Sequence, residues 1–343
     1  MGGQMLDTDA RKVAFLFPGQ GSQTVGMGRD WAELSPIARR TFEEADEVLG
    51  FGLSELIWEG PEEELTLTAN TQPALLTVSV ALHRVLQRTP LQPVAVAGHS
   101  LGEYSALVAA GVLGFADALR LVRQRGELMQ QAVPPGVGAM AAVLMLDPEQ
   151  VAEVALQAQE ETGTAEDGSG GTEPAVCTVA NYNSPIQTVI AGHRAAVQRA
   201  MELAGERGAK RVVELQVSAP FHCPLMKPAR EGMTAPLRDT RFADPEVPVV
   251  TNVDACPVRT GDEAREALIR QIDSPVRWTD SVAWLTGDGG VGALLEIGAG
   301  TVLSGLARRI ARDAEAASLE TPERARELLT GYGIDLDALD DGT

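Results

Sequence analysis

The chain has 343 residues, 44% of them hydrophobic and 22% charged, a composition typical of a soluble globular protein that excludes wholesale disorder. No stretch approaches about 18 consecutive apolar residues and no basic-then-apolar segment opens the chain, so we expect neither a membrane span nor a secretory signal. The 48 acidic and 28 basic side chains give a formal charge of −20, which disfavours nucleic-acid binding because phosphate backbones are also negative.

Cysteine and histidine usage bears on the compartment and on metal binding. The cysteines, Cys177, Cys223 and Cys256, are widely spaced without a CxxC motif, and the four histidines form no HExxH motif. An odd, sparse set of cysteines argues against a disulfide framework and fits a reducing compartment. We therefore expect a cytoplasmic protein without a metal site.

The first part of the chain predicts alternating strands and helices. The apolar run Val13–Phe17 predicts a buried strand that ends at a Pro-Gly turn, and Val94–Ala97 predicts a second buried strand. Helical patterns lie between and after these strands, at about Asp30–Leu49, at Ala74–Arg88 (opened by Thr71-Gln72-Pro73) and at Glu103–Val112. This alternation favours an α/β fold with a parallel sheet.

The order of predicted elements changes after Val133-Pro134-Pro135-Gly136, where strands and helices follow as β-α-β-β-α-β. These predicted elements are the strand Met140–Leu146, the helix Pro148–Gln159, the strands Val176–Ala180 and Thr188–Ala191, the helix Ala195–Arg207 and the strand Arg211–Gln216. The order is typical of a small ferredoxin-like unit inserted into the main fold. Within it we predict the polar, Gly-rich segment Glu160–Pro174 to be a flexible surface loop.

The main fold then resumes with a predicted strand at Val247–Thr251, a helix near Glu263–Gln271 and a strand at Ala293–Ile297. From about Arg312 the sequence is acidic and helix-prone, and we predict a peripheral tail. The predicted organisation is a large subdomain with a parallel sheet (residues 12–132 and 212–312), an inserted ferredoxin-like subdomain (133–211) and an acidic C-terminal tail (313–343).

One motif carries nucleophilic chemistry. Gly98-His99-Ser100-Leu101-Gly102 matches the G-x-S-x-G nucleophile elbow and lies, as that motif requires, between a predicted strand and a predicted helix. The turn is sharp, so side chains at the two glycine positions would collide with neighbouring elements. Ser100 is thereby presented at a helix N-terminus, whose N–H groups can stabilise an oxyanion. The alternative is a serine that only caps a Gly-rich turn.

A nucleophilic serine needs a base, and His222 is the best candidate. It lies in Ser218-Ala219-Pro220-Phe221-His222-Cys223-Pro224, a proline-flanked turn after a predicted strand. The loop after the first strand, with Gln20 in Gly19-Gln20-Gly21, can lie beside the elbow if the two strands are parallel neighbours. The backbone N–H groups of Gln20 and Leu101 then predict an oxyanion hole. A purely structural or phosphate-cradling turn is the alternative, although the loop lacks the Gly-Lys-Ser/Thr of a P-loop.

Seven segments together resemble the malonyl-CoA:acyl carrier protein transacylases of type II fatty acid synthesis, which are related to polyketide synthase acyltransferase domains. The segments, in chain order, are FLFPGQGSQ (15–23), GHSLGEYSALVAAGVL (98–113), RQRGELMQ (123–130), NYNSPIQTVIAG (181–192), SAPFHCPLMKPA (218–229), RQIDSPVRW (270–278) and EIGAGTVLSGL (296–306). The resemblance covers about residues 12–312. It implies an α/β-hydrolase-like large subdomain and a ferredoxin-like small one.

The resemblance also implies roles by position. Ser100 matches the acylated nucleophile and His222 the general base of a Ser–His dyad. Gln271 matches the residue whose main-chain carbonyl orients that histidine, in place of the carboxylate of a hydrolase triad. Gln20 and Leu101 match the amides of the oxyanion hole.

Four further residues are implied to bind substrate. Arg125 matches the arginine that pairs with the free carboxylate of the malonyl group, a role that suits a planar and permanently charged guanidinium. Phe221 resembles the bulky residue of a malonyl-type pocket, which disfavours methylmalonyl. Asn181 and Asn183 match a loop near the CoA side of the family cleft; the alternative is that each satisfies the hydrogen bonds of its own turn.

The implied partners are malonyl-CoA and a holo acyl carrier protein, and the implied enzyme is a monomer that needs no cofactor. Carrier proteins are acidic, so a chain of charge −20 needs a local basic patch to dock one. Candidates are Lys210-Arg211, Lys227 with Arg230, and Arg308-Arg309.

The expected function is ping-pong transfer of malonyl from CoA to the carrier's phosphopantetheine thiol through a malonyl-serine. Three alternatives remain: an acyltransferase of a polyketide pathway, a serine esterase or thioesterase that shares G-x-S-x-G, and a catalytically silent carrier-binding protein. The hydrolase order is Ser, then Asp/Glu, then a late His. Here 121 residues follow His222, and Arg125 and Gln271 have no evident role in a simple esterase.

Overall fold

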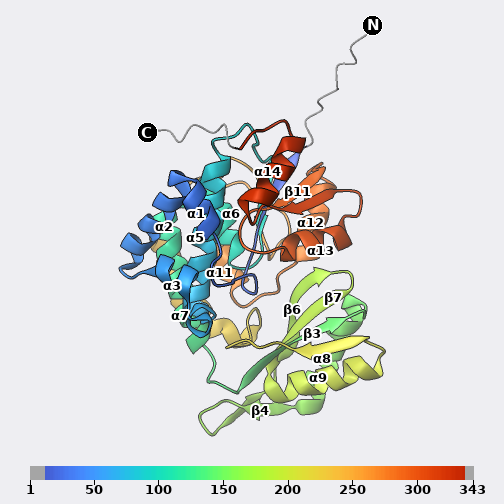
Figure 1. The fold of residues 1–343 in the computed structure, drawn as a ribbon. Helices are drawn as coiled ribbons and strands as arrows, with labels where there is room; N and C mark the ends of the chain where they lie inside the picture. The colour runs from blue at the N-terminus through green and yellow to red at the C-terminus, as the bar shows by residue number, and fades with distance from the viewer. Residues whose placement is uncertain (1–11, 337–343) are drawn as a thin grey trace.

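The computed structural model describes residues 12–336, which form a larger α/β body and a smaller body beneath it (Figure 1). The larger body is built on a six-stranded sheet in the order β10-β9-β2-β1-β11-β12. Its strands are β1 (Val13–Phe17), β2 (Ala95–Gly98), β9 (Val249–Val250), β10 (Pro257–Val258), β11 (Ala293–Glu296) and β12 (Glu315–Ser318). All neighbours pair in parallel except β10 with β9, so the predicted parallel sheet is confirmed.

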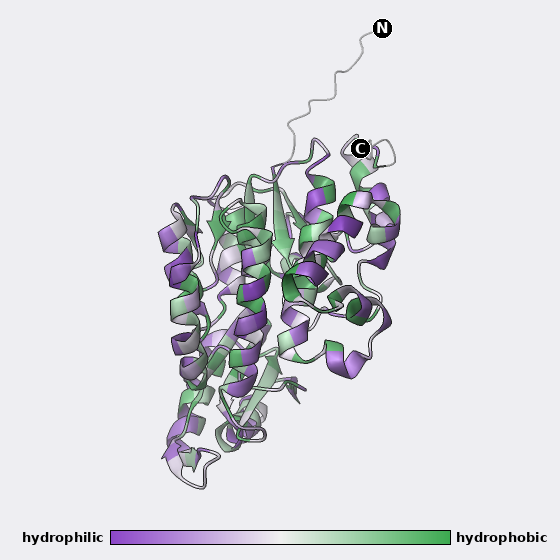
Figure 2. Ribbon diagram, turned by 90° about the vertical axis from the view of Figure 1, so that its left-hand side faces the viewer, coloured by the Kyte–Doolittle hydropathy of each residue, from purple (hydrophilic) through white to green (hydrophobic). Residues whose placement is uncertain are grey.

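Helices cover both faces of this sheet, with α1, α2, α3, α5 and α7 on one side and α12 and α13 on the other (Figure 1). The helices of the larger body are α1 (Arg29–Leu34), α2 (Pro36–Leu49), α3 (Leu53–Glu59), α4 (Glu62–Leu65), α5 (Thr68–Leu86), α6 (Gly102–Ala109), α7 (Phe115–Gln131), α10 (Lys227–Asp239), α11 (Gly261–Gln271), α12 (Trp278–Thr286), α13 (Val302–Ile310) and α14 (Pro322–Gly331). Because the central strands are covered on both faces, β1 is apolar and buried at every position. Figure 2 shows the apolar colouring gathered on these interior strands.

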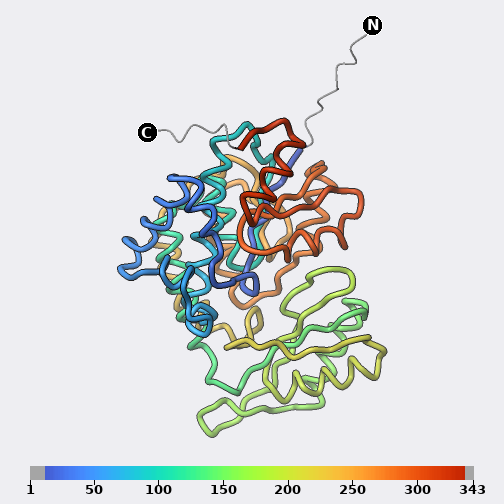
Figure 3. Tube along the Cα trace, viewed as in Figure 1, coloured from blue at the N-terminus to red at the C-terminus, as the bar shows by residue number. Residues whose placement is uncertain are grey.

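The smaller body is an antiparallel sheet in the order β6-β7-β3-β8, packed against two helices. Its elements are β3 (Gly138–Leu144), α8 (Pro148–Thr162), β6 (Cys177–Ser184), β7 (Gln187–His193), α9 (Arg194–Glu206) and β8 (Arg211–Glu214). The β-α-β-β-α-β order and the strand order confirm the ferredoxin-like prediction. Figure 3 shows this stretch of chain, in green and yellow, leaving the larger body and returning to it.

Two helix predictions were wrong in their bounds. The helix predicted over Asp30–Leu49 is two helices, because the Ser35 side chain accepts from the backbone N–H of Ile37 and Pro36 starts a new helix at its N1 position. The helix predicted from Ala74 begins at Thr68 and contains Pro73. Proline cannot donate to the carbonyl of Ala69, and Arg123 Nη1 donates to that oxygen instead, at 3.1 Å.

The segment predicted as a flexible loop, Glu160–Pro174, contains regular secondary structure. Helix α8 runs to Thr162, and a hairpin of β4 (Thr164–Glu166) and β5 (Thr172–Pro174) follows. The turn is organised by Asp167, whose Oδ1 accepts from the backbone N–H groups of Ser169 and Gly171. These bonds lower the pKa of Asp167, because they favour its charged form.

The predicted peripheral tail is part of the larger body as far as residue 336. Strand β12 pairs in parallel with β11 at the edge of the large sheet, and α14 follows it. The indole Nε1 of Trp31 donates to the carbonyl of Glu320 at 3.1 Å, which ties α1 to this segment. Residues 337–343 of the predicted tail lie outside the described residues.

Within residues 12–336, every helix is too short or too polar to traverse a lipid bilayer.

Candidate active site

Ser100 lies in a sharp turn between β2 and α6, with a left-handed backbone φ of 52°. Only glycine fits at Gly98 and Gly102, the two positions that flank this turn. A Cβ on Gly98 would lie 1.9 Å from the carbonyl carbon of Gly102, and one on Gly102 would lie 2.0 Å from the carbonyl oxygen of Phe17. The structure therefore has the strand–turn–helix geometry of a nucleophile elbow.

His222 contacts the serine from a separate part of the chain. Its Nε2 lies 2.7 Å from Ser100 Oγ, and its Nδ1 lies 2.9 Å from the main-chain carbonyl of Gln271, the last residue of α11. A carbonyl oxygen can only accept, so Nδ1 carries the hydrogen and Nε2 is free to accept the serine proton. Ser100, His222 and Gln271 thus form a chain of hydrogen bonds suited to nucleophile activation.

Burial and charge hold this histidine neutral. The side chain of His222 is 4% exposed, and burial is the largest cause that lowers its pKa, to about 3. The positive charge of Arg125 lowers it further. The imidazole is therefore in its basic form throughout the neutral range.

The loop after β1 lies directly against the elbow. Strands β1 and β2 pair in parallel, so the loops that follow them leave the same edge of the sheet. A Cβ on Gly19 would lie 2.4 Å from the carbonyl oxygen of His99, which leaves room for glycine alone. Across the described part of the chain, the backbone N–H groups of Gln20 and Leu101 have no protein acceptor. The two amides are thus available to an oxyanion.

Arg125 lies on α7, and its guanidinium reaches the nucleophile. Nη2 donates to Ser100 Oγ at 3.1 Å and to the side-chain oxygen of Gln271 at 2.9 Å, while Nη1 donates to the side-chain oxygen of Gln72 at 2.7 Å. Arg125 is 1% exposed, and burial lowers its pKa. Its Nε is buried without a partner among the described residues. A buried cation with an unused donor beside a nucleophile suits an anionic substrate group.

Two residues that the sequence did not predict form hydrogen bonds that support the elbow. Asn252, which follows β9, accepts from the N–H of Ser100 at 2.7 Å through Oδ1 and donates to the carbonyl of Gly98 at 2.7 Å through Nδ2. Glu103 accepts at Oε2 from the N–H of Asn252 and from Nε2 of Gln271. Burial raises the pKa of Glu103 to about 7, although these bonds and the charge of Arg125 oppose the rise.

The sequence does contain signals for Asn252 and Glu103, and for Gln72, the partner of Arg125 that it also left unpredicted. Asn252 stands just beyond a predicted strand, at the strand end where parallel sheets collect functional groups. Glu103 directly follows the elbow motif, in a helix that is otherwise mostly apolar. Gln72 lies next to a proline inside a buried helix, and its polar side chain needs a buried partner.

The other predicted substrate residues take different places. Asn181 and Asn183 lie on strand β6 rather than in the expected loop. Asn181 pairs with Val276 in an isolated bridge between the two bodies, and Oδ1 of Asn183 lies 2.9 Å from Nε2 of His99. Phe221 is 8% exposed and precedes His222 in the same turn.

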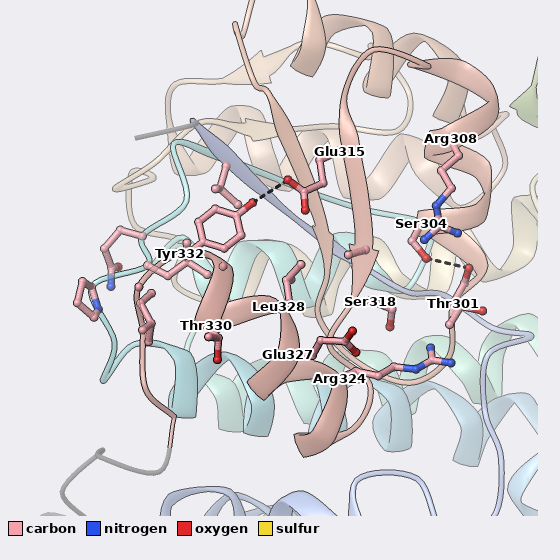
Figure 4. Close-up of a pocket in the computed structure, with 18 residues that line it drawn as sticks. Thr301, Ser304, Arg308, Glu315, Ser318, Arg324, Glu327, Leu328, Thr330 and Tyr332 are labelled. Carbon is pink, nitrogen blue, oxygen red and sulfur yellow. Dashed lines mark hydrogen bonds between the residues drawn. The ribbon is translucent and has the colours of Figure 1, made fainter. Parts of the chain in front are cut away.

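A large cavity lies away from Ser100. It has a volume of about 1460 Å³ and is formed between α13, α14 and β12 (Figure 4). Arg308, Arg324 and Tyr332 are among the residues that line it. None of the lining residues surrounds Ser100. The hydrogen bonds around Ser100, and not this cavity, therefore identify the candidate site. No cluster of three or more metal-ligating side chains occurs within residues 12–336.

Comparison with known proteins agrees with this constellation. A family model described as the acyl transferase domain matches residues 14–321. The malonyl CoA-acyl carrier protein transacylase of Escherichia coli K12 is 50% identical over 312 residues, which cover 91% of this chain and 96% of that protein. The chain belongs to the malonyl CoA-acyl carrier protein transacylase family. The resemblance drawn from the seven sequence segments is thereby confirmed.

Solved structures of the transacylase family share the architecture. An acyl carrier protein S-malonyltransferase from Vibrio cholerae is 46% identical, with a TM-score of 0.87 over 92% of this chain and 99% of that one. A malonyl-transacylase solved in complex with a type II polyketide synthase acyl carrier protein is 45% identical, with a TM-score of 0.87 over 93% of this chain and 99% of that one. The α/β fold with two subdomains is that of the transacylases.

Proposed function

We propose that the protein transfers a malonyl group from malonyl-CoA to the phosphopantetheine thiol of an acyl carrier protein, through a malonyl ester of Ser100. The observation that carries this proposal is the convergence of two groups on one oxygen: Ser100 Oγ lies 2.7 Å from His222 Nε2 and 3.1 Å from Arg125 Nη2. A serine with a base suits acyl transfer, and a buried guanidinium beside it suits an acyl group that carries its own carboxylate. The names of the relatives support this substrate pair.

In the first half-reaction, Ser100 Oγ bonds to the thioester carbon while its proton passes to His222 Nε2. The carbonyl oxygen becomes an oxyanion, which the N–H groups of Gln20 and Leu101 stabilise, each such donor typically contributing about 2.7–4 kcal/mol. The carbon–sulfur bond then breaks, and the imidazolium gives its proton to the sulfur of the departing CoA. Malonyl-Ser100 remains, and Arg125 binds its carboxylate.

The second half-reaction reverses this order with a new thiol. His222 Nε2 takes the proton of the carrier's phosphopantetheine thiol as the sulfur bonds to the ester carbon. The bond to Ser100 Oγ breaks, and the proton returns to that oxygen. Side chains and backbone groups carry every step, so the proposed reaction needs no cofactor.

The choice of acyl group depends on a side chain beside His222. We assign to the buried ring of Phe221 the crowding of the acyl α-carbon, where an extra methyl group costs roughly 1–3 kcal/mol in discrimination.

The cysteines Cys177, Cys223 and Cys256 are all free thiols, which supports a cytoplasmic location. We further propose that the enzyme acts as a monomer.

The constellation supports a transferase over a serine hydrolase. A hydrolase triad orients its histidine with a carboxylate, whereas Nδ1 of His222 bonds to a main-chain carbonyl. The relative solved with a polyketide synthase carrier supports a second candidate, transfer to a polyketide carrier, because the same site chemistry serves either carrier. The two differ only in the partner that discharges Ser100.

The decisive experiment is intact mass after incubation with malonyl-CoA, for the native chain and for Ser100→Ala. We expect a malonyl adduct on the native chain alone, discharged by a holo acyl carrier protein. Fatty-acid-type and polyketide-type carriers tested in parallel distinguish the two pathways. An adduct that decays to malonate at the same rate with and without carrier indicates a hydrolase, and the absence of any adduct rules out the malonyl assignment.

For the acidic carrier, we propose docking at Lys210 and Arg211, at the start of β8. Both are exposed, and the structure gives neither an ion pair within residues 12–336. The other candidates have local partners: Arg230 lies 3.0 Å from Asp273, and Arg308 donates to the carbonyl of Ala316.

Reversing both charges (Lys210→Glu with Arg211→Glu) is expected to raise the KM for the carrier at least tenfold, because like charges then face each other. The KM for malonyl-CoA, measured by the acylation rate of Ser100, serves as the control and should stay within about twofold. An unchanged carrier KM contradicts this docking site.

A further inference from the structure

The guanidinium of Arg125 is buried among neutral acceptors. Its three hydrogen bonds go to a hydroxyl oxygen and to two side-chain amide oxygens, those of Ser100, Gln271 and Gln72. Among residues 12–336 no carboxylate forms an ion pair with it; Glu103 acts on it only through a longer-range electrostatic interaction. Buried arginines normally have a carboxylate partner, because an uncompensated buried charge is costly.

Gln72 provides the shortest of these bonds, at 2.7 Å, from α5. Its side chain is 2% exposed, and its Nε2 lies 3.8 Å from the Sδ of Met129, which stands one helical turn after Arg125 on α7. The amide therefore turns its oxygen to the guanidinium and its nitrogen to a weak acceptor. The contact orients Arg125 without contributing any negative charge.

An amide and a carboxylate at this position have different consequences. An amide oxygen satisfies one N–H of the guanidinium but leaves the unit positive charge in place, free to attract an anion. A carboxylate of nearly the same shape would accept the same hydrogen bond and also neutralise the charge. The arginine would then have little to gain from a substrate carboxylate.

We propose that Gln72 is a specificity-determining residue, which positions Arg125 as a neutral acceptor and so reserves its charge for the carboxylate of the incoming acyl group. This inference rests on the proposed malonyl transfer and identifies what selects a carboxylated acyl group over a neutral one of similar size. Gln271 shares the contact, but it also holds His222 and the carbonyl of Ser100, so its substitution would disturb the nucleophile. Among residues 12–336, the side chain of Gln72 makes hydrogen bonds to Arg125 and Met129 and to no other residue of the site.

The test compares acylation of Ser100 by malonyl-CoA and by acetyl-CoA, measured as CoA release and as intact mass, in the native chain, Gln72→Met and Gln72→Glu. Gln72→Met removes the positioning acceptor but adds no charge, and we expect it to lower the malonyl-to-acetyl ratio of kcat/KM by about 3- to 10-fold, through the KM for malonyl-CoA. Gln72→Glu adds the counter-charge, and we expect a ratio at least tenfold below that of Gln72→Met.

Acetyl transfer is the internal control, because a general loss of structure lowers both substrates together. A native ratio in Gln72→Met overturns the positioning role, and this result decides the proposal even if Gln72→Glu fails to fold. A ratio in Gln72→Glu equal to or above that of Gln72→Met overturns the role of charge. Failure of the native chain to accept malonyl at all refutes the proposed function instead, so the two failures are distinguishable.

Discussion

Ser100 is held by its backbone as much as by its side chain. Its φ of 52° lies in the left-handed region, which is costly for any residue other than glycine and persists only where the surroundings enforce it. Asn252 makes two hydrogen bonds on either side of the strained turn: it accepts from the N–H of Ser100 and donates to the carbonyl of Gly98. His222 has a similar strained backbone, with a φ of 58°. Both members of the dyad therefore depend on neighbouring elements for their position.

We expect Asn252→Ala to lower kcat for the acylation of Ser100 by at least tenfold, because the elbow loses the two hydrogen bonds that Asn252 makes to its backbone. The loss of buried hydrogen bonds is also expected to reduce the free energy of unfolding by about 1–3 kcal/mol. Ser281→Ala is the matched control: its buried hydroxyl bonds to the carbonyls of Thr251 and Arg277, away from the elbow. Equal kcat values in the two variants would show that Asn252 has only a structural role.

The lowered pKa of His222, about 3, predicts an unusual pH dependence. An imidazole with the ordinary pKa of about 6.5 loses roughly tenfold of its neutral form between pH 7.5 and pH 5.5. In this protein the neutral form persists over that range. We therefore expect Ser100 to react with a neutral fluorophosphonate at a nearly constant rate from pH 7.5 to pH 5.5, with circular dichroism to verify that the fold is intact. A tenfold fall in this rate would falsify the prediction.

At the scale of single residues, the sequence singled out the groups that surround Ser100 Oγ better than the residues that hold those groups in place. Ser100, His222 and Arg125 lie in recognisable motifs, and the structure brings them together at hydrogen-bonding distance. The contributions of Gln72 and Asn252 depend on contacts between segments far apart in the chain. A local signal can single out such a residue, but the partners that it contacts cannot be derived without the fold.

Among the elements, the parallel pairing of β1 with β2 does most to build the site. It brings the loop of Gln20 beside the elbow, and the fit is close enough that a Cβ on Gly102 would lie 2.0 Å from the carbonyl of Phe17 at the end of β1. The neighbouring atom is backbone, so it cannot rotate away. The register of β1 with β2 therefore requires glycine at position 102.

We expect Gly102→Ala to destabilise the protein by about 3 kcal/mol or more, since overpacking against backbone forces the elements apart. Gly205→Ala is the control, because Gly205 lies in the exposed part of helix α9 with no atom within 4 Å of its Cβ position. That change should be neutral or stabilise by up to about 1 kcal/mol. Urea denaturation of both variants measures the difference, and equal midpoints would contradict the steric argument.

The predicted elements were correct where an apolar run or a helical period was uninterrupted, as in β1 and α9. They failed where a side chain from elsewhere decided the outcome. Pro73 lies inside α5 because Arg123 satisfies the carbonyl that proline leaves free, and β12 exists because β11 offers it a sheet edge. Local propensity cannot encode either compensation.

At the scale of the whole molecule, two bodies meet at β6. Strand β6 pairs with Val276 of the larger body through Asn181, and Asn183 of the same strand bonds to His99, the residue before the nucleophile. These contacts join the ferredoxin-like subdomain directly to the elbow. The relative position of the two subdomains is therefore defined beside the reacting serine.

The charge of −20 predicts how salt acts on stability. Screening weakens both the repulsion among the excess acids and the exposed ion pairs, such as Arg199 with Glu161 and Arg270 with Asp254. Exposed pairs contribute only about 0–1 kcal/mol each, so we expect the repulsion to dominate. Tm should rise by several degrees between 20 and 300 mM NaCl, and equally in KCl, as measured by calorimetry. A fall in Tm would mean that the ion pairs outweigh the repulsion.

The position of β1 has a consequence for synthesis on the ribosome. Strand β1 lies in the middle of the large sheet, and one of its two partners, β11, begins only at Ala293. The nascent protein must therefore carry one unpaired side of a fully apolar strand until β11 has been made, a situation that invites aggregation. All four strands of the ferredoxin-like sheet are present once β8 has emerged, so we expect this subdomain to fold before β9 to β12 complete the larger sheet.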